Sequence, residues 1–144
     1  MRPLQSVRVF GTIGIACSLA CSGVTDPSPG LSLELEHATL TLAVVRDSGL
    51  HATFVNRTAT PVRVTSIGCS GLGSLVDRFL NGDWVAVPPT VQNYMCPLIL
   101  VDNSVPPGGT LSTHAERFAP DTGRFRLRLA TSAGEAISGA VEVR

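Results

Sequence analysis

The chain has 144 residues, of which 11 are basic and 11 acidic, and 44% are hydrophobic. This length allows one sizeable hydrophobic core and leaves no room for a second. All the basic residues are arginines and they form no long basic stripe, which argues against nucleic acid as a partner.

Residues 1–20 have the three parts of a secretory signal. Arg2 and Arg8 give a positive start, an apolar run follows over residues 9–16, and small residues end the segment. A bilayer-spanning helix takes about 20 apolar residues, so the run is too short to span. The sequence therefore predicts a signal peptide that is cleaved.

The end of this segment, Ser18-Leu19-Ala20-Cys21, resembles the bacterial lipobox, in which small residues precede a lipidated cysteine. Ser18 stands where the family pattern prefers leucine, and Gly14-Ile15-Ala16-Cys17 is a rival match that also lacks that leucine. We favour Cys21 because residues 22–30 after it form a Pro-rich polar tether. The resemblance implies lipidation at Cys21 and a membrane anchor. Cleavage without lipid, giving a secreted or periplasmic protein, is the alternative.

Two of the four cysteines, Cys69 and Cys96, remain once Cys17 is removed with the signal and Cys21 carries lipid. Two thiols in an exported chain can pair, so we expect a Cys69–Cys96 disulfide. A metal or redox site is the alternative, but the spacing is not Cys-x-x-Cys and no histidine lies close in sequence.

The chain after the tether reads as strands. Residues 31–36, LSLELE, alternate with leucines at odd positions, whereas residues 39–45, TLTLAVV, alternate with Leu40, Leu42 and Val44 at even positions. This reversal predicts a bend near His37-Ala38, where the chain crosses from one sheet to another.

The middle of the chain continues the pattern. Residues 50–56 and 61–69 alternate, and Asn81-Gly82 predicts a type I′ hairpin within RFLNGDWVAV. The stretch SLVDRFL, residues 74–80, is read as a strand or as a short helical turn. The stretch CPLILV, residues 96–101, is apolar throughout, which is typical of a strand covered on both faces.

The last third holds three further strands. TLSTHAERF follows a Pro-Gly turn, and RFRLRLA places Phe125, Leu127 and Leu129 on one face and three arginines on the other. AISGAVEV is read with Ile137, Gly139, Val141 and Val143 inward. Nine or ten short strands predict an all-β fold, a single antiparallel β-sandwich or a barrel over residues 31–144.

Several segments together resemble bacterial immunoglobulin-like domains, in particular the BsuPI-like, intracellular proteinase-inhibitor-like arrangement. They are LHATFVNRTATPVRV, NGDWVAV, VPPGGTLS and DTGRFRLRL. The resemblance implies an immunoglobulin-like β-sandwich. The two cysteines and the export signal depart from an intracellular inhibitor, so inhibition is not carried over.

Residues that could carry chemistry are few. His37, His51 and His114 are read as solvent-facing, and no Gly-x-Ser-x-Gly elbow is present. Met95-Cys96 as a copper site lacks nearby histidines. GCSGLG, residues 68–73, lacks the Lys-Ser/Thr of a phosphate loop, and the sequon Asn56-Arg57-Thr58 is read as a turn. We predict no catalytic residue, no metal and no cofactor.

Two surfaces remain as candidates for binding. Arg124, Arg126 and Arg128, with Arg117 nearby, are read as a solvated outer face in preference to a stripe for an acidic partner. The loop of residues 85–95 carries Val91, Tyr94 and Met95, which are read either as a partner contact or as core.

These observations lead to three hypotheses. The first is a monomeric, exported, lipid-anchored cell-envelope protein that serves as a non-catalytic binding or accessory domain of unknown partner. The second is a secreted or anchored protease inhibitor acting through the 85–95 loop. The third is a small hydrolase or metal protein, which a structure with all three histidines apart and exposed would exclude.

Overall fold

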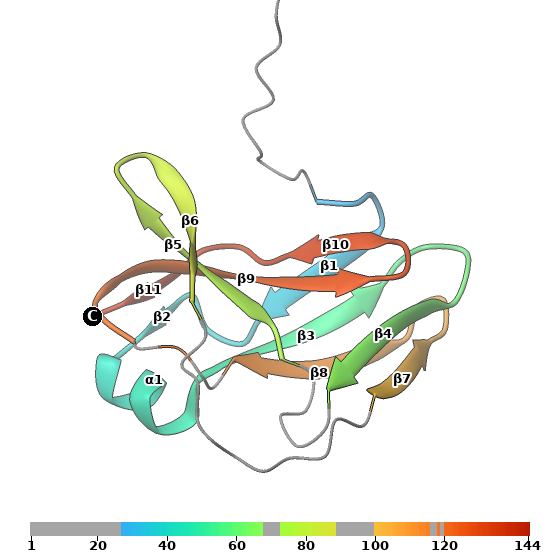
Figure 1. The fold of residues 1–144 in the computed structure, drawn as a ribbon, viewed down its shortest axis with the longest axis horizontal. Coiled ribbons are helices and arrows are strands. Elements are labelled where there is room, and N and C mark those ends of the chain that lie inside the picture. The colour runs from blue at the N-terminus through green and yellow to red at the C-terminus, as the bar shows by residue number, and fades with distance from the viewer. Residues whose placement is uncertain (1–26, 68–72, 89–99, 116–117, 119) are drawn as a thin grey trace, which may run out of the picture.

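The computed structural model describes residues 27–67, 73–88, 100–115, 118 and 120–144. Antiparallel sheets pack together into an all-β sandwich, as predicted (Figure 1). One sheet has the order β1-β3-β8, the largest has β2-β11-β9-β5-β6 with β10 also paired to β9, and β4 pairs with β7. The elements are β1 (Leu31–Leu35), β2 (Thr39–Leu40), α1 (Leu42–Ser48), β3 (Leu50–Asn56), β4 (Val62–Ile67), β5 (Leu75–Leu80), β6 (Asp83–Val87), β7 (Leu100–Val105), β8 (Thr110–Ala115), β9 (Gly123–Thr131), β10 (Gly134–Ile137) and β11 (Val141–Val143).

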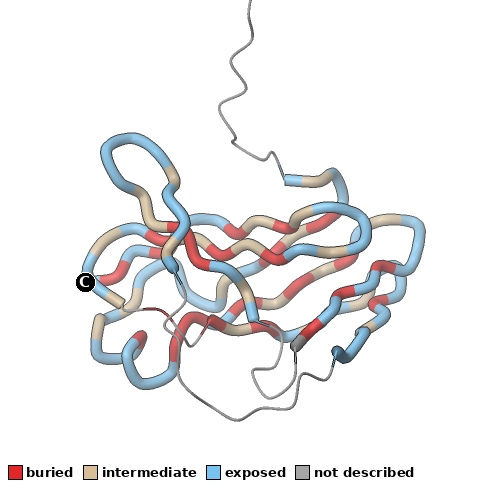
Figure 2. Tube along the Cα trace, viewed as in Figure 1, coloured by how far each residue is buried: buried red, intermediate tan, exposed pale blue. Residues whose placement is uncertain are grey.

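The core forms where alternating strands turn their apolar faces toward one another. Burial alternates along the strands, as the red segments of Figure 2 show. The predicted inward sets of β1, β3, β4 and β9 are confirmed: the buried residues include Leu31, Leu33, Leu50, Ala52, Phe54, Val62, Val64, Phe125, Leu127 and Leu129. These side chains leave water on folding, which is the main favourable term for a domain of this kind.

The predicted crossing between sheets near His37-Ala38 is confirmed. β1 pairs with β3 in one sheet, whereas β2 pairs in parallel with β11 in the other. The prediction that the second strand runs through Val45 is wrong, because the chain turns into α1 after Leu40.

Helix α1 forms because both of its ends are capped. The Thr41 hydroxyl accepts a hydrogen bond from the Val44 amide at 3.4 Å, and Gly49 ends the helix with φ 73°. The helix buries Val45 and leaves Val44 exposed, which is the reverse of the predicted strand.

The predicted hairpin at Asn81-Gly82 is confirmed. Both residues have positive φ, 53° and 96°, as a type I′ turn requires. The helical alternative for residues 74–80 is wrong, since Leu75–Leu80 is β5. The β5–β6 hairpin rises above the body of the sandwich in Figure 1.

Two predicted burial patterns near the C-terminal half are wrong. Leu100 and Val101 in β7 are exposed, because β7 pairs only with β4 among the described strands and its outer face stays uncovered. Between β10 and β11 the inward positions are Ala136 and Ser138, not Ile137 and Gly139. The Ser138–Ala140 link between the two strands restores the predicted inward positions at Val141 and Val143.

Candidate functional site

Several residues singled out from the sequence lie outside the described residues. They are Cys21, Cys69, Cys96, Val91, Tyr94, Met95 and Arg117. Of the 85–95 loop, the described part is residues 85–88, which comprise the end of β6 and Pro88. The predicted lipidation, disulfide and loop contact therefore remain predictions.

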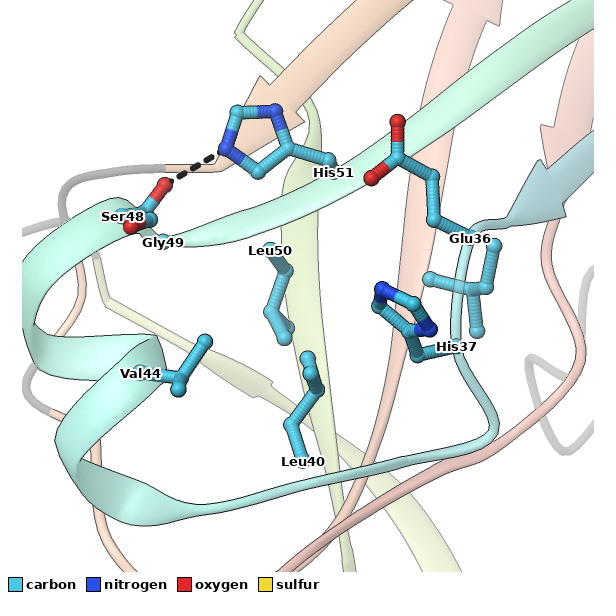
Figure 3. A pocket seen from close by; sticks show the side chains of 9 residues that line it. Glu36, His37, Leu40, Val44, Ser48, Gly49, Leu50 and His51 are labelled. Atoms are coloured by element: carbon cyan, nitrogen blue, oxygen red, sulfur yellow. Dashed lines mark hydrogen bonds between the residues drawn. The ribbon is translucent and has the colours of Figure 1, made fainter.

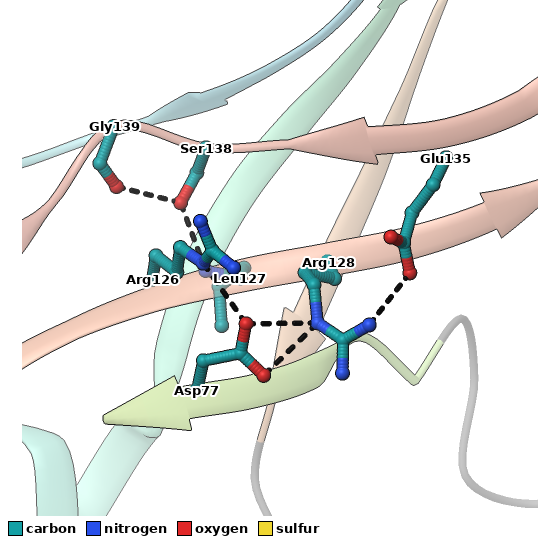
Figure 4. A network of polar contacts seen from close by, with 7 residues as sticks. All are labelled: Asp77, Arg126, Leu127, Arg128, Glu135, Ser138 and Gly139. Carbon is teal, nitrogen blue, oxygen red and sulfur yellow. Dashed lines mark hydrogen bonds and ion pairs between the residues drawn. The ribbon is translucent and has the colours of Figure 1, made fainter. Parts of the chain in front are cut away.

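The arginines of β9 do not form the solvated row that the sequence predicted. Asp77 of β5 lies beneath two of them with its side chain only 3% exposed (Figure 4). Its carboxylate accepts from Nε of Arg126 at 2.9 Å and from Nε of Arg128 at 2.9 Å. The two arginine side chains are 14% and 21% exposed. Arg126 and Arg128 therefore form ion pairs with a buried carboxylate and do not project freely into solvent.

The same network joins three strands. Arg128 of β9 also donates from Nη1 to Glu135 of β10 at 2.9 Å. Next to it, the Ser138 hydroxyl accepts from the Leu127 amide at 2.8 Å and donates to the Gly139 carbonyl at 2.7 Å (Figure 4). These bonds satisfy the backbone where β10 ends, and they tie β5, β9 and β10 together.

Two of the arginines also cover aromatic rings of the hairpin. The Arg126 guanidinium lies 4.7 Å from the centre of the Trp84 ring, and that of Arg124 lies 5.1 Å from the centre of the Phe79 ring. The two rings are 5.2 Å apart at 60°. Such stacking holds the hairpin against β9. The sequence indicated the alternation along β9 but not that Asp77 would pair with its arginines. The available sign was a single acidic residue in the mainly apolar stretch SLVDRFL.

Arg124 is exposed and has an acidic neighbour. Glu142 lies opposite it in the β9–β11 register and accepts two hydrogen bonds from Arg144, each 3.1 Å long. The hydrogen bond from Arg144 lowers the pKa of Glu142, with smaller contributions from the charges of Arg144 and Arg124. Carboxylates therefore accompany the arginine row along its length, which weakens the interpretation of the row as a binding stripe for an acidic partner.

The tip of the β5–β6 hairpin exposes apolar side chains. Leu80 is 42% exposed and Val85 47% exposed, on the face opposite to Phe79 and Trp84. β9 pairs with β5 only over Leu75–Arg78, so the described part of the sheet ends below the tip. We take this tip, residues 79–85, as the candidate contact surface.

The histidines do not all behave as the sequence predicted. His51 and His114 face each other across β3 and β8, with ring centres 6.0 Å apart, and His114 is half-buried. His37 is exposed and lines the same cavity as His51 (Figure 3). Because two histidines are neighbours, the condition that would exclude the hydrolase hypothesis is not met.

The cavity of Figure 3 has a volume of about 440 Å³ and lies between β1, β2, α1 and β3. Its polar atoms are not arranged as a nucleophile with its base. Nε2 of His51 lies 2.7 Å from the Ser48 carbonyl oxygen, while the Ser48 hydroxyl donates to Asp47. In the part of the chain that the structure describes, no group of three or more His, Cys, Asp or Glu could hold a metal ion.

The sequon Asn56-Arg57-Thr58 is a structural turn, as predicted. Asn56 is fully buried, and its amide donates to the carbonyls of Thr60 and Val105, both at 2.9 Å. Its oxygen accepts from the amide and the hydroxyl of Thr58, at 3.0 and 2.7 Å. An amide in this position is not available for glycan attachment in the folded protein.

We expect Asn56→Ala to lower the free energy of unfolding by about 1–3 kcal/mol, because it leaves buried backbone groups without partners. Asn103→Ala is the matched control, since the Asn103 side chain is half-buried and, among the described residues, makes one 3.4 Å bond, to the Val64 carbonyl. Urea unfolding followed by circular dichroism measures both variants. Equal losses in the two would contradict the role given to Asn56.

Comparisons with known proteins do not assign the chain to a family. The chain matches no protein-family model and no curated protein sequence. No helix among the described residues is long and apolar enough to cross a membrane.

Proposed function

We propose that this protein is an exported, lipid-anchored domain of the bacterial cell envelope that acts by binding rather than by catalysis. The observation that carries the proposal is the Ser18–Cys21 sequence followed at once by a short tether. The tether reaches the domain at Ser28, whose amide donates to the Glu135 carbonyl at 3.1 Å. Ser28 Oγ also accepts from the Glu135 amide at 3.2 Å.

This attachment supports a tethering role because it defines where the domain is held. Ser28 comes seven positions after Cys21, and a chain of that length spans at most about 25 Å. An acyl chain on Cys21 would therefore hold the β10 side of the domain close to the membrane.

The polar groups of the described residues support binding over catalysis. Asp77 and Glu135 together balance the charges of Arg126 and Arg128 in the largest sheet. The ring of His51 is engaged with a backbone carbonyl and not with the Ser48 hydroxyl. The apolar hairpin tip is left as the surface suited to contact, since exposed apolar residues gathered in one place favour interaction sites.

Intact mass of the protein extracted from membranes tests the proposal. We expect loss of residues 1–20 and the added mass of acyl chains on Cys21. Cys21→Ser should remove the acyl mass and shift the protein out of the membrane fraction. Cys17→Ser is the matched control and should leave both unchanged, because Cys17 belongs to the cleaved signal. Wild-type protein without acyl chains, or with acyl chains on Cys17, would contradict it.

A further inference from the structure

The tip of the β5–β6 hairpin carries apolar side chains on both of its faces. Phe79 and Trp84 pair across the hairpin on one face. On the other face Leu80 is paired with Asp83 and Val85 with Arg78. A strand pair inside a sandwich buries one face and hydrates the other. Here the aliphatic face is nearly half exposed and the aromatic face is covered in part by two arginines. Leu80 and Val85 thus remain exposed to water outside the hydrophobic core.

The tip and the tether lie on the same side of the molecule. Ser28 is bonded to β10, which belongs to the same sheet as the hairpin. In Figure 1 the first described residues and the hairpin both stand along the upper side of the body, and the hairpin rises away from it. A membrane that holds Cys21 within about 25 Å of Ser28 would therefore lie on the side from which the tip projects.

The residue types at the tip suit the boundary between headgroups and acyl chains. Tryptophan and other aromatic rings gather at that depth, and arginine keeps its charge in the headgroups while its stem lies on apolar atoms. Arg124 is exposed, and its guanidinium lies 5.1 Å from the centre of the Phe79 ring, beside the tip. Asp83, the one acid of the tip, favours a zwitterionic over an anionic surface.

We infer that the β5–β6 hairpin tip seats in the headgroup region of the membrane to which the chain is tethered, and so fixes the orientation of the domain. The inference rests on the proposed lipid anchor. It adds to that anchor a second contact, made by the folded domain itself. In Figure 1, α1 lies on the lower side of the body, so this helix and the cavity of Figure 3 would then face away from the lipid.

Trp84 is the only tryptophan of the chain and so reports directly on the tip. The acylated protein is reconstituted into phosphatidylcholine vesicles, with plain lipid or with lipid brominated near the glycerol end of its acyl chains. We expect the brominated lipid to reduce Trp84 emission. Unchanged emission in an acylated protein overturns the inference, leaves the lipid anchor intact, and assigns the tip to a protein partner instead.

Two matched variants locate the contact. Val85→Asp places a charge on the tip, and Val44→Asp places the same charge on α1 at a valine of similar exposure, 45% against 47%. Quenching should be lost with Val85→Asp and kept with Val44→Asp, with circular dichroism confirming that both variants fold. Equal quenching in both overturns the inference. If intact mass finds no acyl chain, the proposed function fails, and the chain added to the same vesicles still tests the tip through Trp84.

Discussion

Replacing Asp77 with asparagine should cost about 3–5 kcal/mol of the free energy of unfolding, the usual effect of removing one partner of a buried ion pair. Asp77 is the common acceptor of Arg126 and Arg128, and all three side chains are largely withdrawn from water. With Asp77 neutral, Glu135 alone faces two guanidinium charges in this network. One charge would then remain without a counter-ion in a place that water hardly reaches. Urea unfolding followed by far-ultraviolet circular dichroism measures the loss.

Glu34→Gln is the control for this prediction. It removes the same charge by the same isosteric change, but the Glu34–Arg57 pair is about half exposed on both sides. An exposed pair of this kind contributes about 0–1 kcal/mol, so the control should be close to wild type. If Asp77→Asn is as stable as Glu34→Gln, the buried ion pairs of Asp77 contribute no more to the free energy of unfolding than an exposed pair does.

The strands that the sequence predicted well are those with one face buried and one face solvated. β3 and β9 alternate strictly, and a one-residue slip would have exposed Phe54 or Phe125. Asn81-Gly82 was equally informative because few residue pairs accept positive φ at both positions. In each case a local requirement, burial of one strand face or positive φ in a turn, leaves few other conformations for the segment.

Helix α1 shows where alternation misleads. Over a run as short as residues 39–45, apolar residues at every second position fit a strand, yet Leu42 and Val45 also lie three apart on one helical face. The caps at Thr41 and Gly49 decide between the two. Both cap residues are visible in the sequence, so a search for helix ends would have found them.

The candidate site was less predictable because it depends on contacts between distant segments. Nothing near Asp77 in sequence indicates that Arg126 and Arg128 will lie above it, and their pairing follows only from the β5–β9 register. For the same reason the sequence predicted a solvated arginine face, and it predicted the hairpin without its exposed apolar tip. The side on which the tether meets the domain also depends on the Ser28–Glu135 contact, across more than a hundred residues.

The register of β4 and β7 bears on the predicted disulfide. Ile67, the last residue of β4, lies opposite Leu100, the first residue of β7. Cys69 comes two residues after Ile67 and Cys96 comes four residues before Leu100. Both cysteines lie outside the described residues, so the ladder fixes only the pairing of Ile67 with Leu100, and the disulfide remains a prediction.

A Cys69–Cys96 disulfide would close a loop of 27 residues in the chain, and its loss should cost about 3.5 kcal/mol if it acts mainly on the unfolded chain. Cys69→Ser, Cys96→Ser and the double variant should then lose the same free energy of unfolding, because each breaks the same bond. Reducing agent should lower the stability of wild type to that level and leave the double variant unchanged. Cys17→Ser is the control and should equal wild type in the mature protein. Additive losses, or a wild type whose stability does not change with reducing agent, would mean that the two thiols are not bonded, since only a shared covalent bond makes the second substitution cost nothing.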